Sequence, residues 1–369
     1  MIDDRAHGLT VIRAVTRVVV VPLRRPIIAD IGRFDHWPLI LLDLETAGGA
    51  VGSSYIAPYR QAAVPGIVAE IADLVDNVVS RQTSPVGAFD AAAKALNVIG
   101  ISGVSRIAMS AIDMALWDAL AKNVGVPLAV LLGGSLGPVR AYNSNGLWRH
   151  DPASLGAEAV ALLAEGGFTA AKLRLGHEQL YDDFAALDAV RDALGGHIDL
   201  MVDFNQALGF GDAIRRCHEL DDQDLYWFEE PIRYDNISGY AQLAHSVKTP
   251  LQMGENHYGA RDLWNLAHVG GIHYAMGDLM RIGGVTGWMR TAGAAAAAGI
   301  QYSNHLYPEF AAHLLRVTPT AHWLEWVDWA HPILDSPALP ADGFVTAPER
   351  PGAGLVWDEA AVKRYQVNR

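Results

Sequence analysis

The fold is decided by three short motifs: MVDFNQ (201–206), WFEEP (227–231) and QMGEN (252–256). Each motif closes an apolar run with an acidic residue, and Asp203, Glu229 and Glu255 follow one another at a constant interval of 26 residues. This interval is close to the length of one strand–helix unit. Because such units repeat around a parallel barrel, the three carboxylates are expected at one height on its carboxyl-terminal rim, where barrel enzymes keep their chemistry.

Short apolar runs alternate with longer helical patterns on both sides of these motifs. Eight runs have the character of strands: 139–144, 170–175, 198–204, 225–229, 250–254, 272–277, 300–303 and 323–325. The alternation favours parallel βαβ units, and eight of them close a barrel. We therefore predict an α/β fold with a modified TIM-type (β/α)₈ barrel over residues 133–330. The Ala-rich stretch 291–299 is too short to span a bilayer and is expected to be a buried helix.

The segments before and after the barrel, residues 1–132 and 331–369, are expected to form an α+β capping domain together. A β-rich stretch over 10–21, a polar loop over 24–37 and a strand from Pro38 predict a hairpin. Helical spacing predicts helices over 63–74 and 105–122, the second capped by Ser105. The tail is expected to pack back on the N-terminal region.

Composition and charge narrow the class of protein. Hydrophobic residues make up 51% of the chain and charged residues 19%, which is typical of a globular protein with a large core. The formal net charge of −13 disfavours nucleic acid and anionic membranes as partners, because both need a positive surface. Neither a signal-peptide pattern nor a membrane-length apolar run is present, and the single cysteine, Cys217, fits a reducing compartment. We expect a soluble cytoplasmic protein with a small-molecule substrate.

The three evenly spaced carboxylates predict a metal site. Converging carboxylates repel one another unless a cation lies between them. Hard oxygen ligands with room for water and substrate suit Mg²⁺, with Mn²⁺ as the alternative. Each acid taken alone could instead cap a helix or pair with an arginine. As an evenly spaced trio, Asp203, Glu229 and Glu255 favour the metal.

Four further motifs complete the series: AAKLRLG (170–176), MGDLMRIGGVTGW (276–288), SNHLYPEFAAHLL (303–315) and TPTAHWLEW (318–326). With the first three, they closely resemble the enolase superfamily, and within it the mandelate racemase subgroup, over nearly the whole chain. The resemblance implies a capping domain built from both termini, a modified barrel, and Mg²⁺ on the three carboxylates. It also implies a homo-oligomer, octameric or dimer-based.

The same resemblance implies roles for individual residues. His305 is expected to be the general base and Asp278 its partner, since a carboxylate on one imidazole nitrogen fixes the tautomer and raises the basicity of the other. Glu325 is expected to be a protonated acid that donates a hydrogen bond to the developing enolate, which requires a raised pKa. Asn205 and Ser144 match residues near the substrate carboxylate, although either could simply satisfy a backbone group at a strand end.

The chain departs from mandelate racemase at Lys172-Leu173-Arg174, where the racemase has Lys-x-Lys. The i, i+2 spacing points Lys172 and Arg174 to the same side of a strand. Arginine keeps its proton to above about pH 12, so Arg174 is a poor base and a good carboxylate clamp. Lys172 is expected to hold the carboxylate, or to act as a base if Arg174 and the metal lower its pKa.

Polar residues of the capping region are expected to contact the substrate. The charged loop carries Arg24, Arg25, Asp30, Arg33, Asp35 and His36. Arg33 and His36, together with Tyr55 farther along the chain, are the predicted contacts from this region. Charged groups there would suit a polyhydroxylated chain, although the loop could equally be solvated with its charges pointing outward.

These observations predict a Mg²⁺-dependent enzyme that removes the α-proton of a carboxylate substrate and stabilises the enolate. With one obvious base, His305, the favoured reaction is dehydration of an acid sugar to a 2-keto-3-deoxy acid, a step of carbohydrate acid catabolism. The alternative is a racemase or epimerase of a 2-hydroxy acid, which needs two bases. Two alternatives come from other functional classes. One is a metal-free aldolase in which Lys172 forms a Schiff base with the substrate, and the other is a protein without catalytic activity.

Overall fold

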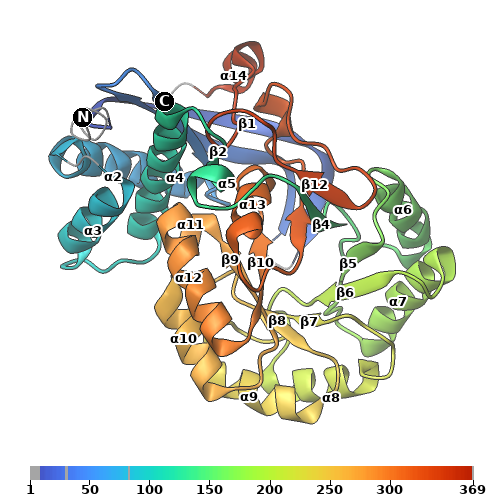
Figure 1. Ribbon diagram of the computed structural model, residues 1–369. Helices are drawn as coiled ribbons and strands as arrows, with labels where there is room; N and C mark the ends of the chain where they lie inside the picture. Colours follow the sequence, from blue (N-terminus) through green and yellow to red (C-terminus); the bar gives the residue numbers. More distant parts are fainter. Residues whose placement is uncertain (1–8, 30–31, 82–83, 368–369) are drawn as a thin grey trace.

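The computed structural model describes residues 9–29, 32–81 and 84–367. Figure 1 shows two parts, a capping region with helices and an antiparallel sheet at the top and a barrel below it. The barrel holds eight parallel strands in the order β10-β9-β8-β7-β6-β5-β4-β11. They are β4 (Pro138–Asn143), β5 (Ala170–Arg174), β6 (Asp199–Asp203), β7 (Phe228–Glu229), β8 (Leu251–Met253), β9 (Tyr274–Asp278), β10 (Gln301–His305) and β11 (Leu324–Trp326).

The predicted eight-stranded barrel is confirmed, with one seam between β10 and β11, where no strand ladder forms. The side chain of Asn304 on β10 bridges this seam. Its Nδ2 donates to the Glu325 carbonyl at 3.1 Å, and its Oδ1 accepts from the Glu325 amide at 2.8 Å. One side-chain amide thus takes the place of a pair of ladder hydrogen bonds.

Helices surround the strands on the outside of the barrel (Figure 1). The predicted Ala-rich helix is part of α12, in which Thr291, Ala292 and Ala295 are buried. The barrel helices are α6 (Pro152–Ala164), α7 (Leu180–Leu194), α8 (Phe210–Leu220), α9 (Ile237–Ser246), α10 (Ala260–Val269), α11 (Leu279–Ile282), α12 (Gly284–Ala298), α13 (Pro308–Leu314) and the 3₁₀ turn η3 (Leu315–Val317).

The capping region is a three-stranded antiparallel sheet, β1-β2-β3, with helices packed beside it. Both faces of β2 are covered over Leu39 to Leu42, because successive side chains point to opposite faces and each of these residues is at most 1% exposed. The elements are β1 (Val11–Ala29), β2 (Gly32–Thr46), β3 (Val51–Ile56), η1 (Gln61–Ala63), α2 (Val64–Asn77), η2 (Val79–Arg81), α3 (Pro85–Leu96), α4 (Val104–Val124) and α5 (Leu128–Leu131).

Two local predictions for this region are wrong. The polar segment 24–37 is not a loop, because β1 and β2 continue their pairing through it, with Ile27 opposite Phe34 and Ile28 opposite Arg33. A register shift between Pro22 and Ile27 absorbs the proline at 26, which lacks a backbone donor. Ser105 does not cap its helix, since α4 begins at Val104 behind Gly103.

The C-terminal tail contacts both parts of the molecule. Helix α14 (Glu359–Tyr365) lies against the capping sheet, where Arg17 on β1 forms an ion pair with Glu359 at 2.6 Å and Val19 bridges Gln366. Strand β12 (Phe344–Thr346) instead pairs antiparallel with barrel strand β4, after the turn η4 (His331–Ile333). The boundaries at 132 and 330 stay predictions from the sequence.

A cluster of large aromatic side chains fills the barrel interior near the starts of the strands. Trp227 and Trp323 are fully buried against Tyr142, and Arg140 lies over the Trp323 ring at 3.7 Å. Because this end is filled, the opposite, carboxyl-terminal end is left for a site.

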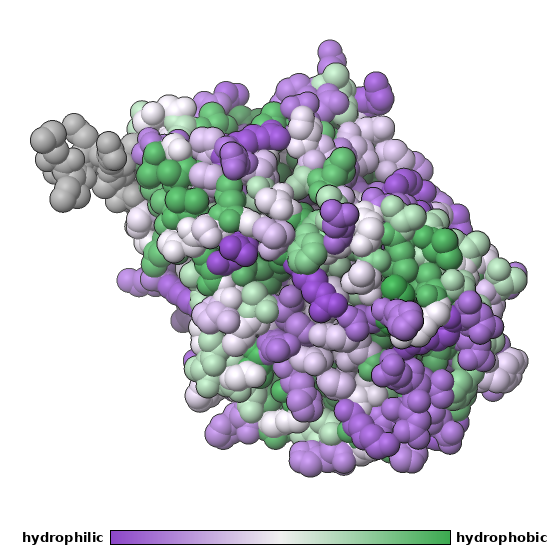
Figure 2. All heavy atoms as spheres, turned by 45° about the vertical axis from the view of Figure 1, so that its right-hand side comes forward, coloured by the Kyte–Doolittle hydropathy of each residue, from purple (hydrophilic) through white to green (hydrophobic). Residues whose placement is uncertain are grey.

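The surface in Figure 2 is mixed, with hydrophilic side chains over much of this face and hydrophobic ones in separate patches. Among the residues that the structure describes, no helix combines the length and hydropathy needed to cross a membrane.

Candidate active site

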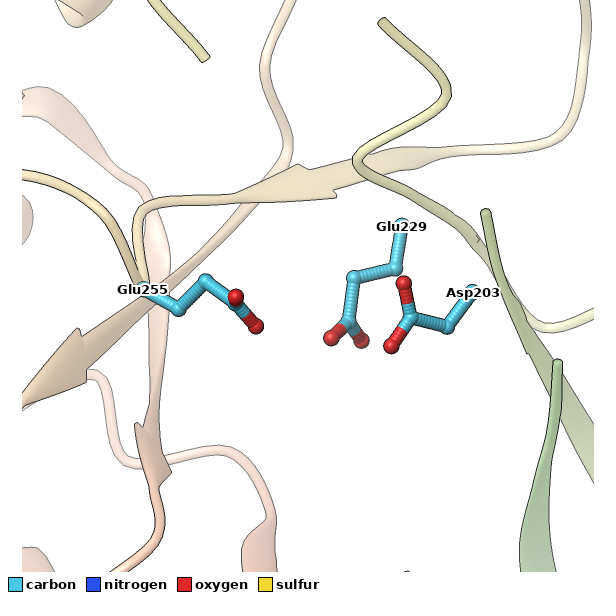
Figure 3. Close-up of side chains that lie close together, drawn as sticks. All are labelled: Asp203, Glu229 and Glu255. Atoms are coloured by element: carbon cyan, nitrogen blue, oxygen red, sulfur yellow. The ribbon is translucent and has the colours of Figure 1, made fainter. Parts of the chain in front are cut away.

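Three acidic side chains meet at the carboxyl-terminal end of the barrel. Strands β6 and β7 end at Asp203 and Glu229, and Glu255 follows β8 by two residues. One carboxylate oxygen from each lies within 4.8 Å of the others. Figure 3 shows Asp203 and Glu229 side by side, with Glu255 pointing towards them from the other side. The three carboxylates, evenly spaced in the sequence, therefore lie together at one end of the barrel.

Lys172 on β5 contacts three carboxylates at once. Its Nζ lies 2.6 Å from Glu229, 2.9 Å from Glu325 and 3.5 Å from Asp203. Burial lowers the pKa of Lys172, but the surrounding negative charges outweigh it and raise the pKa well above the ordinary value. With its amine between these carboxylates, Lys172 is placed to hold charge, and its alternative role as a base whose pKa is lowered by the metal stays a prediction.

The acidic cluster has the chemistry of a site for a hard divalent cation. Burial raises the pKa of Glu229 to about 8, and Asp203, Glu325 and Glu255 add to this, while Lys172 acts against it. Like charges crowded in this way are relieved by a cation. Asn205 orients one ligand, donating to both oxygens of Asp203 from its backbone amide at 2.8 Å and its side chain at 3.0 Å. An all-oxygen set of this kind fits Mg²⁺ or Mn²⁺.

His305, the last residue of β10, pairs with Asp278, the last residue of β9. Nδ1 of the imidazole lies 2.7 Å from Oδ2 of Asp278, and Nε2 lies 3.4 Å from Glu255. Asp278 also caps α11, since its Oδ1 accepts from the Met280 amide at 2.8 Å. Burial lowers the pKa of His305, but Glu255 and the hydrogen bond to Asp278 outweigh it and raise the pKa to about 9. The imidazole is thus held by a fixed carboxylate next to the acidic cluster.

Glu325 on β11 is held as a carboxylate rather than as the expected protonated acid. Oε1 accepts from the Ser144 hydroxyl at 2.7 Å and faces Lys172, and Oε2 accepts from the Leu306 amide at 2.9 Å. Burial raises the pKa of Glu325, but Lys172, His305 and these hydrogen bonds bring it well below the ordinary value. The sequence did not reveal that Lys172 is shared with this glutamate.

Arg174 is bound mainly to the protein itself. Its Nη1 donates to the carbonyls of Gly146 at 2.8 Å and Ser144 at 3.2 Å, and its Nη2 donates to the Ser144 hydroxyl at 2.8 Å. The guanidinium also lies over the Trp148 ring at 4.0 Å. Only Nε is without a hydrogen bond, and it faces Asp203 at 4.0 Å. A clamp on a substrate carboxylate, as expected from the sequence, is therefore left to Nε, because the other nitrogens are already bound to the protein.

Several residues that sequence reasoning did not single out support the metal ligands. Glu230, fully buried, accepts from the side chains of Gln206 at 2.7 Å and Asn256 at 2.8 Å. Arg281 donates to the Glu255 carbonyl at 2.7 Å and to the Asn256 side chain at 2.8 Å. Glu230 and Asn256 directly follow the ligands Glu229 and Glu255, and Gln206 and Arg281 come three residues after Asp203 and Asp278. Their places in the motifs were the signal that could have identified them.

The site opens into a cavity of about 830 Å³ between the barrel end and the capping region. Seven predicted site residues line it: Lys172, Arg174, Asp203, Asn205, Glu255, His305 and Glu325. Glu229 and Asp278 lie behind these, buried and in contact with them. The capping region contributes Ile27, Phe34, Trp37, Pro58, Tyr59, Arg60, Ala63 and Ile107.

Four predicted substrate contacts do not line this cavity. Arg33 pairs with Asp35 at 2.8 Å, with both side chains more than half exposed, and His36 is exposed at the edge of β2. Tyr55 is buried and donates to Glu309 at 2.5 Å. Ser144 is buried as the bridge between Arg174 and Glu325.

Phe34 and Trp37 line the cavity, whereas Arg33 and His36 do not. Alternation accounts for the adjacent pair Arg33 and Phe34, but Phe34 and Trp37 are three residues apart and are separated by the register shift of the hairpin, which falls at Asp35. Asp30, another member of the charged segment, lies outside the described residues.

Comparison with known proteins agrees with this geometry. Residues 11–133 match the mandelate racemase / muconate lactonizing enzyme N-terminal domain, and residues 154–361 match the enolase C-terminal domain-like family. The chain belongs to the enolase superfamily. Its mandelate racemase / muconate lactonizing enzyme architecture is thus confirmed, with the acidic trio on the barrel as predicted.

Individual relatives align with most of the length of this chain. The L-talarate/galactarate dehydratase of Salmonella typhimurium is 32% identical over 332 residues, 89% of this chain and 83% of that enzyme. An enolase from alpha proteobacterium bal199 with bound Mg²⁺ is 47% identical, with a TM-score of 0.95 over 97% of this chain and 99% of that one. A Bradyrhizobium enolase with magnesium and mandelic acid is 39% identical, with a TM-score of 0.93 and the same coverage.

Proposed function

We propose that this protein is a Mg²⁺-dependent hydro-lyase that dehydrates a 2,3-dihydroxy carboxylate, of which acid sugars are one class, to a 2-keto-3-deoxy acid. The observation that carries the proposal is the His305–Asp278 pair facing the metal carboxylates across one cavity. The relationship to a dehydratase of talarate and galactarate supports the same reaction class.

The base is His305. Because Asp278 accepts from Nδ1, the lone pair of neutral imidazole lies on Nε2, where it can take the α-proton of a substrate in the cavity. The protonated imidazole can then return this proton to the hydroxyl leaving from C3, so that one water departs. The enol that remains becomes the 2-keto acid, and no external reductant or oxidant is needed.

The charge of the substrate is balanced by groups around the base. Bound Mg²⁺, held by Asp203, Glu229 and Glu255, would supply Lewis acidity toward the substrate carboxylate. Lys172, paired with Glu229 and Glu325, offers a positive charge at the floor of the cavity, where charge accumulates as the α-proton leaves. Glu325 and Ser144 fix the position of this lysine and of Arg174.

Racemisation of a 2-hydroxy acid is the second candidate, supported by the Bradyrhizobium relative that holds mandelic acid. A racemase must deliver a proton to the face opposite the one from which it was removed. Among the described residues that line the cavity, the side chains that carry basic nitrogens besides His305 are Lys172, Arg60, Arg174 and Arg281. The arginines offer no free lone pair near neutral pH, and Nζ of Lys172 is engaged by Glu229 at 2.6 Å and Glu325 at 2.9 Å. This favours a reaction that needs a single base.

Product formation and proton exchange together test the proposal. The purified protein is incubated with Mg²⁺ and a library of hydroxy acids, and keto acid is detected with semicarbazide while α-proton exchange in D₂O is followed by NMR. We expect keto acid from a 2,3-dihydroxy acid, loss of the activity with EDTA, and recovery with Mg²⁺. Inversion of a 2-hydroxy acid without keto product would replace dehydration by racemisation.

We further propose a cytoplasmic homo-oligomer, octameric or dimer-based. The buried free thiol of Cys217 supports a reducing compartment. Light scattering coupled to size-exclusion chromatography measures the assembly, and a monodisperse monomer at micromolar concentration would refute it.

A further inference from the structure

Both carboxylate oxygens of Glu229 are held by donors from the barrel interior. Oε1 faces Nζ of Lys172 at 2.6 Å. Oε2 accepts from Nε1 of Trp227 at 3.0 Å and from Nε2 of Gln252 at 3.3 Å. All four residues are at most 1% exposed. The carboxylate is therefore held from three places at once, namely β5, β8 and the residue position just before β7.

The position of Trp227 in the chain explains why its indole reaches Glu229. Trp227 directly precedes β7 and lies two residues before Glu229. Strand alternation therefore places the two side chains on the same side, the inside of the barrel. The Trp227 carbonyl accepts from the Val202 amide at 3.1 Å, which keeps this residue in line with β6. The indole thus lies one layer below the carboxylate, toward the amino-terminal end of the barrel.

The aromatic cluster at that end of the barrel holds the indole in place. The Trp227 ring packs edge to face against Tyr142 at 5.7 Å, Tyr226 at 5.3 Å and Tyr274 at 6.1 Å. A ring packed on several sides in a dense interior has little room to turn. Because an indole nitrogen can only donate, its hydrogen bond has a fixed sense as well as a fixed direction. The orientation of Oε2 of Glu229 is therefore set by the packing of the cluster.

We propose that Trp227 is a positioning residue for the metal ion: its indole N–H, assisted by Gln252, orients the carboxylate of Glu229 so that it meets a cation together with Asp203 and Glu255. Partners behind a metal ligand strengthen binding because they hold the ligand in the direction that the metal needs. The indole carries no net charge, so, unlike Lys172, it orients the ligand without repelling the cation. This inference rests on the metal site of the proposed function, and it is tested by metal binding and not by turnover.

The barrel itself offers a matched control. Trp323 is as fully buried as Trp227 and packs in the same cluster, at 6.2 Å from Tyr142 and 5.7 Å from Tyr226. Its Nε1, however, has no hydrogen-bond partner among the described residues. Trp227→Phe and Trp323→Phe remove the same atoms and keep a ring, but only Trp227→Phe removes a donor to a metal ligand. In calorimetry the Kd for Mg²⁺ should rise about tenfold in Trp227→Phe and stay within about twofold of the native value in Trp323→Phe.

A third variant removes the other donor to Oε2 and leaves the aromatic cluster complete. Gln252→Met should weaken Mg²⁺ binding about threefold, less than Trp227→Phe, because the hydrogen bond that it removes is longer. Urea unfolding without metal shows whether each variant folds, and Gln252→Met decides if Trp227→Phe does not. Equal Mg²⁺ affinity of the two tryptophan variants, or native affinity in Gln252→Met, would overturn the positioning role. A native protein that binds Mg²⁺ but forms no keto acid would refute dehydration and leave this role intact.

Discussion

The substitution Asp278→Asn tests the assigned base most directly. In the native chain Oδ1 of Asp278 caps α11 and Oδ2 accepts from Nδ1 of His305 at 2.7 Å. Asparagine can keep the cap through its remaining oxygen, but it presents an NH₂ group to the imidazole. The proton of neutral His305 is then forced onto Nε2, and the nitrogen that faces the substrate loses its lone pair.

The size of the effect follows from this change of tautomer. The corresponding change in a serine protease triad lowers kcat by about 10⁴-fold, which is roughly 5 kcal/mol of transition-state free energy. We expect a loss of that order in both α-proton exchange and keto-acid formation. Asp278→Ala should lose a similar factor and, in addition, about 1 kcal/mol of folding free energy, because the helix cap is removed as well.

The assay is α-proton exchange in D₂O with the best substrate found, followed by NMR, with Mn²⁺ affinity measured on the same samples by calorimetry. Asp278→Asn should bind Mn²⁺ within a few-fold of the native chain, since Asp278 is not among the metal carboxylates. If its exchange rate stays within tenfold of the native rate, His305 is not the base in the sense proposed.

Three further predictions concern charge. Lys172→Met should bind Mg²⁺ several-fold more tightly in calorimetry, because a cation within 3.5 Å of Asp203 and Glu229 is removed. Its turnover should fall at least about 100-fold. Weaker Mg²⁺ binding would contradict this prediction. Glu165→Gln breaks the pairs to Arg24 and Arg25 and should lower the unfolding free energy by about 1–3 kcal/mol in urea titration, against no change for Lys248→Gln at an exposed pair. Burial raises the pKa of Asp113 to about 7, above about 3.9 in the unfolded chain. Its stabilising contribution is therefore complete below about pH 4 and lost as the pH rises through 7, so the native chain should lose roughly 4 kcal/mol of unfolding free energy relative to Asp113→Asn between pH 4 and pH 8; a pH-independent difference would contradict the shift.

The barrel and its metal carboxylates could be predicted from the sequence because both depend on repetition. One strand–helix unit has a nearly fixed length, so Asp203, Glu229 and Glu255 recur at the same height once the units close. His305 and Asp278 could be assigned because they end adjacent parallel strands, which places their side chains together. In each case the position along a strand determines the position in space.

The capping hairpin could not be predicted in the same way. Charged residues over 24–36 suggested a polar loop over the substrate. Which of their side chains line the cavity depends instead on the register shift in the hairpin and on ion pairs to distant residues. Phe34 and Arg33 are adjacent in sequence and lie on opposite faces, so the composition of the segment says little about which side chains meet the cavity. The contact of Lys172 with Glu325 was missed for a related reason, since it joins β5 to β11 and no local pattern reports it.

The bridge made by Asn304 across the open seam of the barrel bears on how this enzyme could change its chemistry. On one side of the bridge is His305, and on the other is Glu325, whose own backbone amide and carbonyl form the bridge. Besides this amide, the two strands are joined by the bridge between Tyr302 and Ala321 and by the hydrogen bond from the Leu306 amide to Glu325, instead of by a continuous ladder. A substitution at position 304 would remove the two hydrogen bonds that lie next to both side chains and so alter the reach of the base, while the metal ligands at the ends of β6, β7 and β8 stay where they are. Such a seam gives evolution, or a protein engineer, a place to retune proton transfer without rebuilding the barrel.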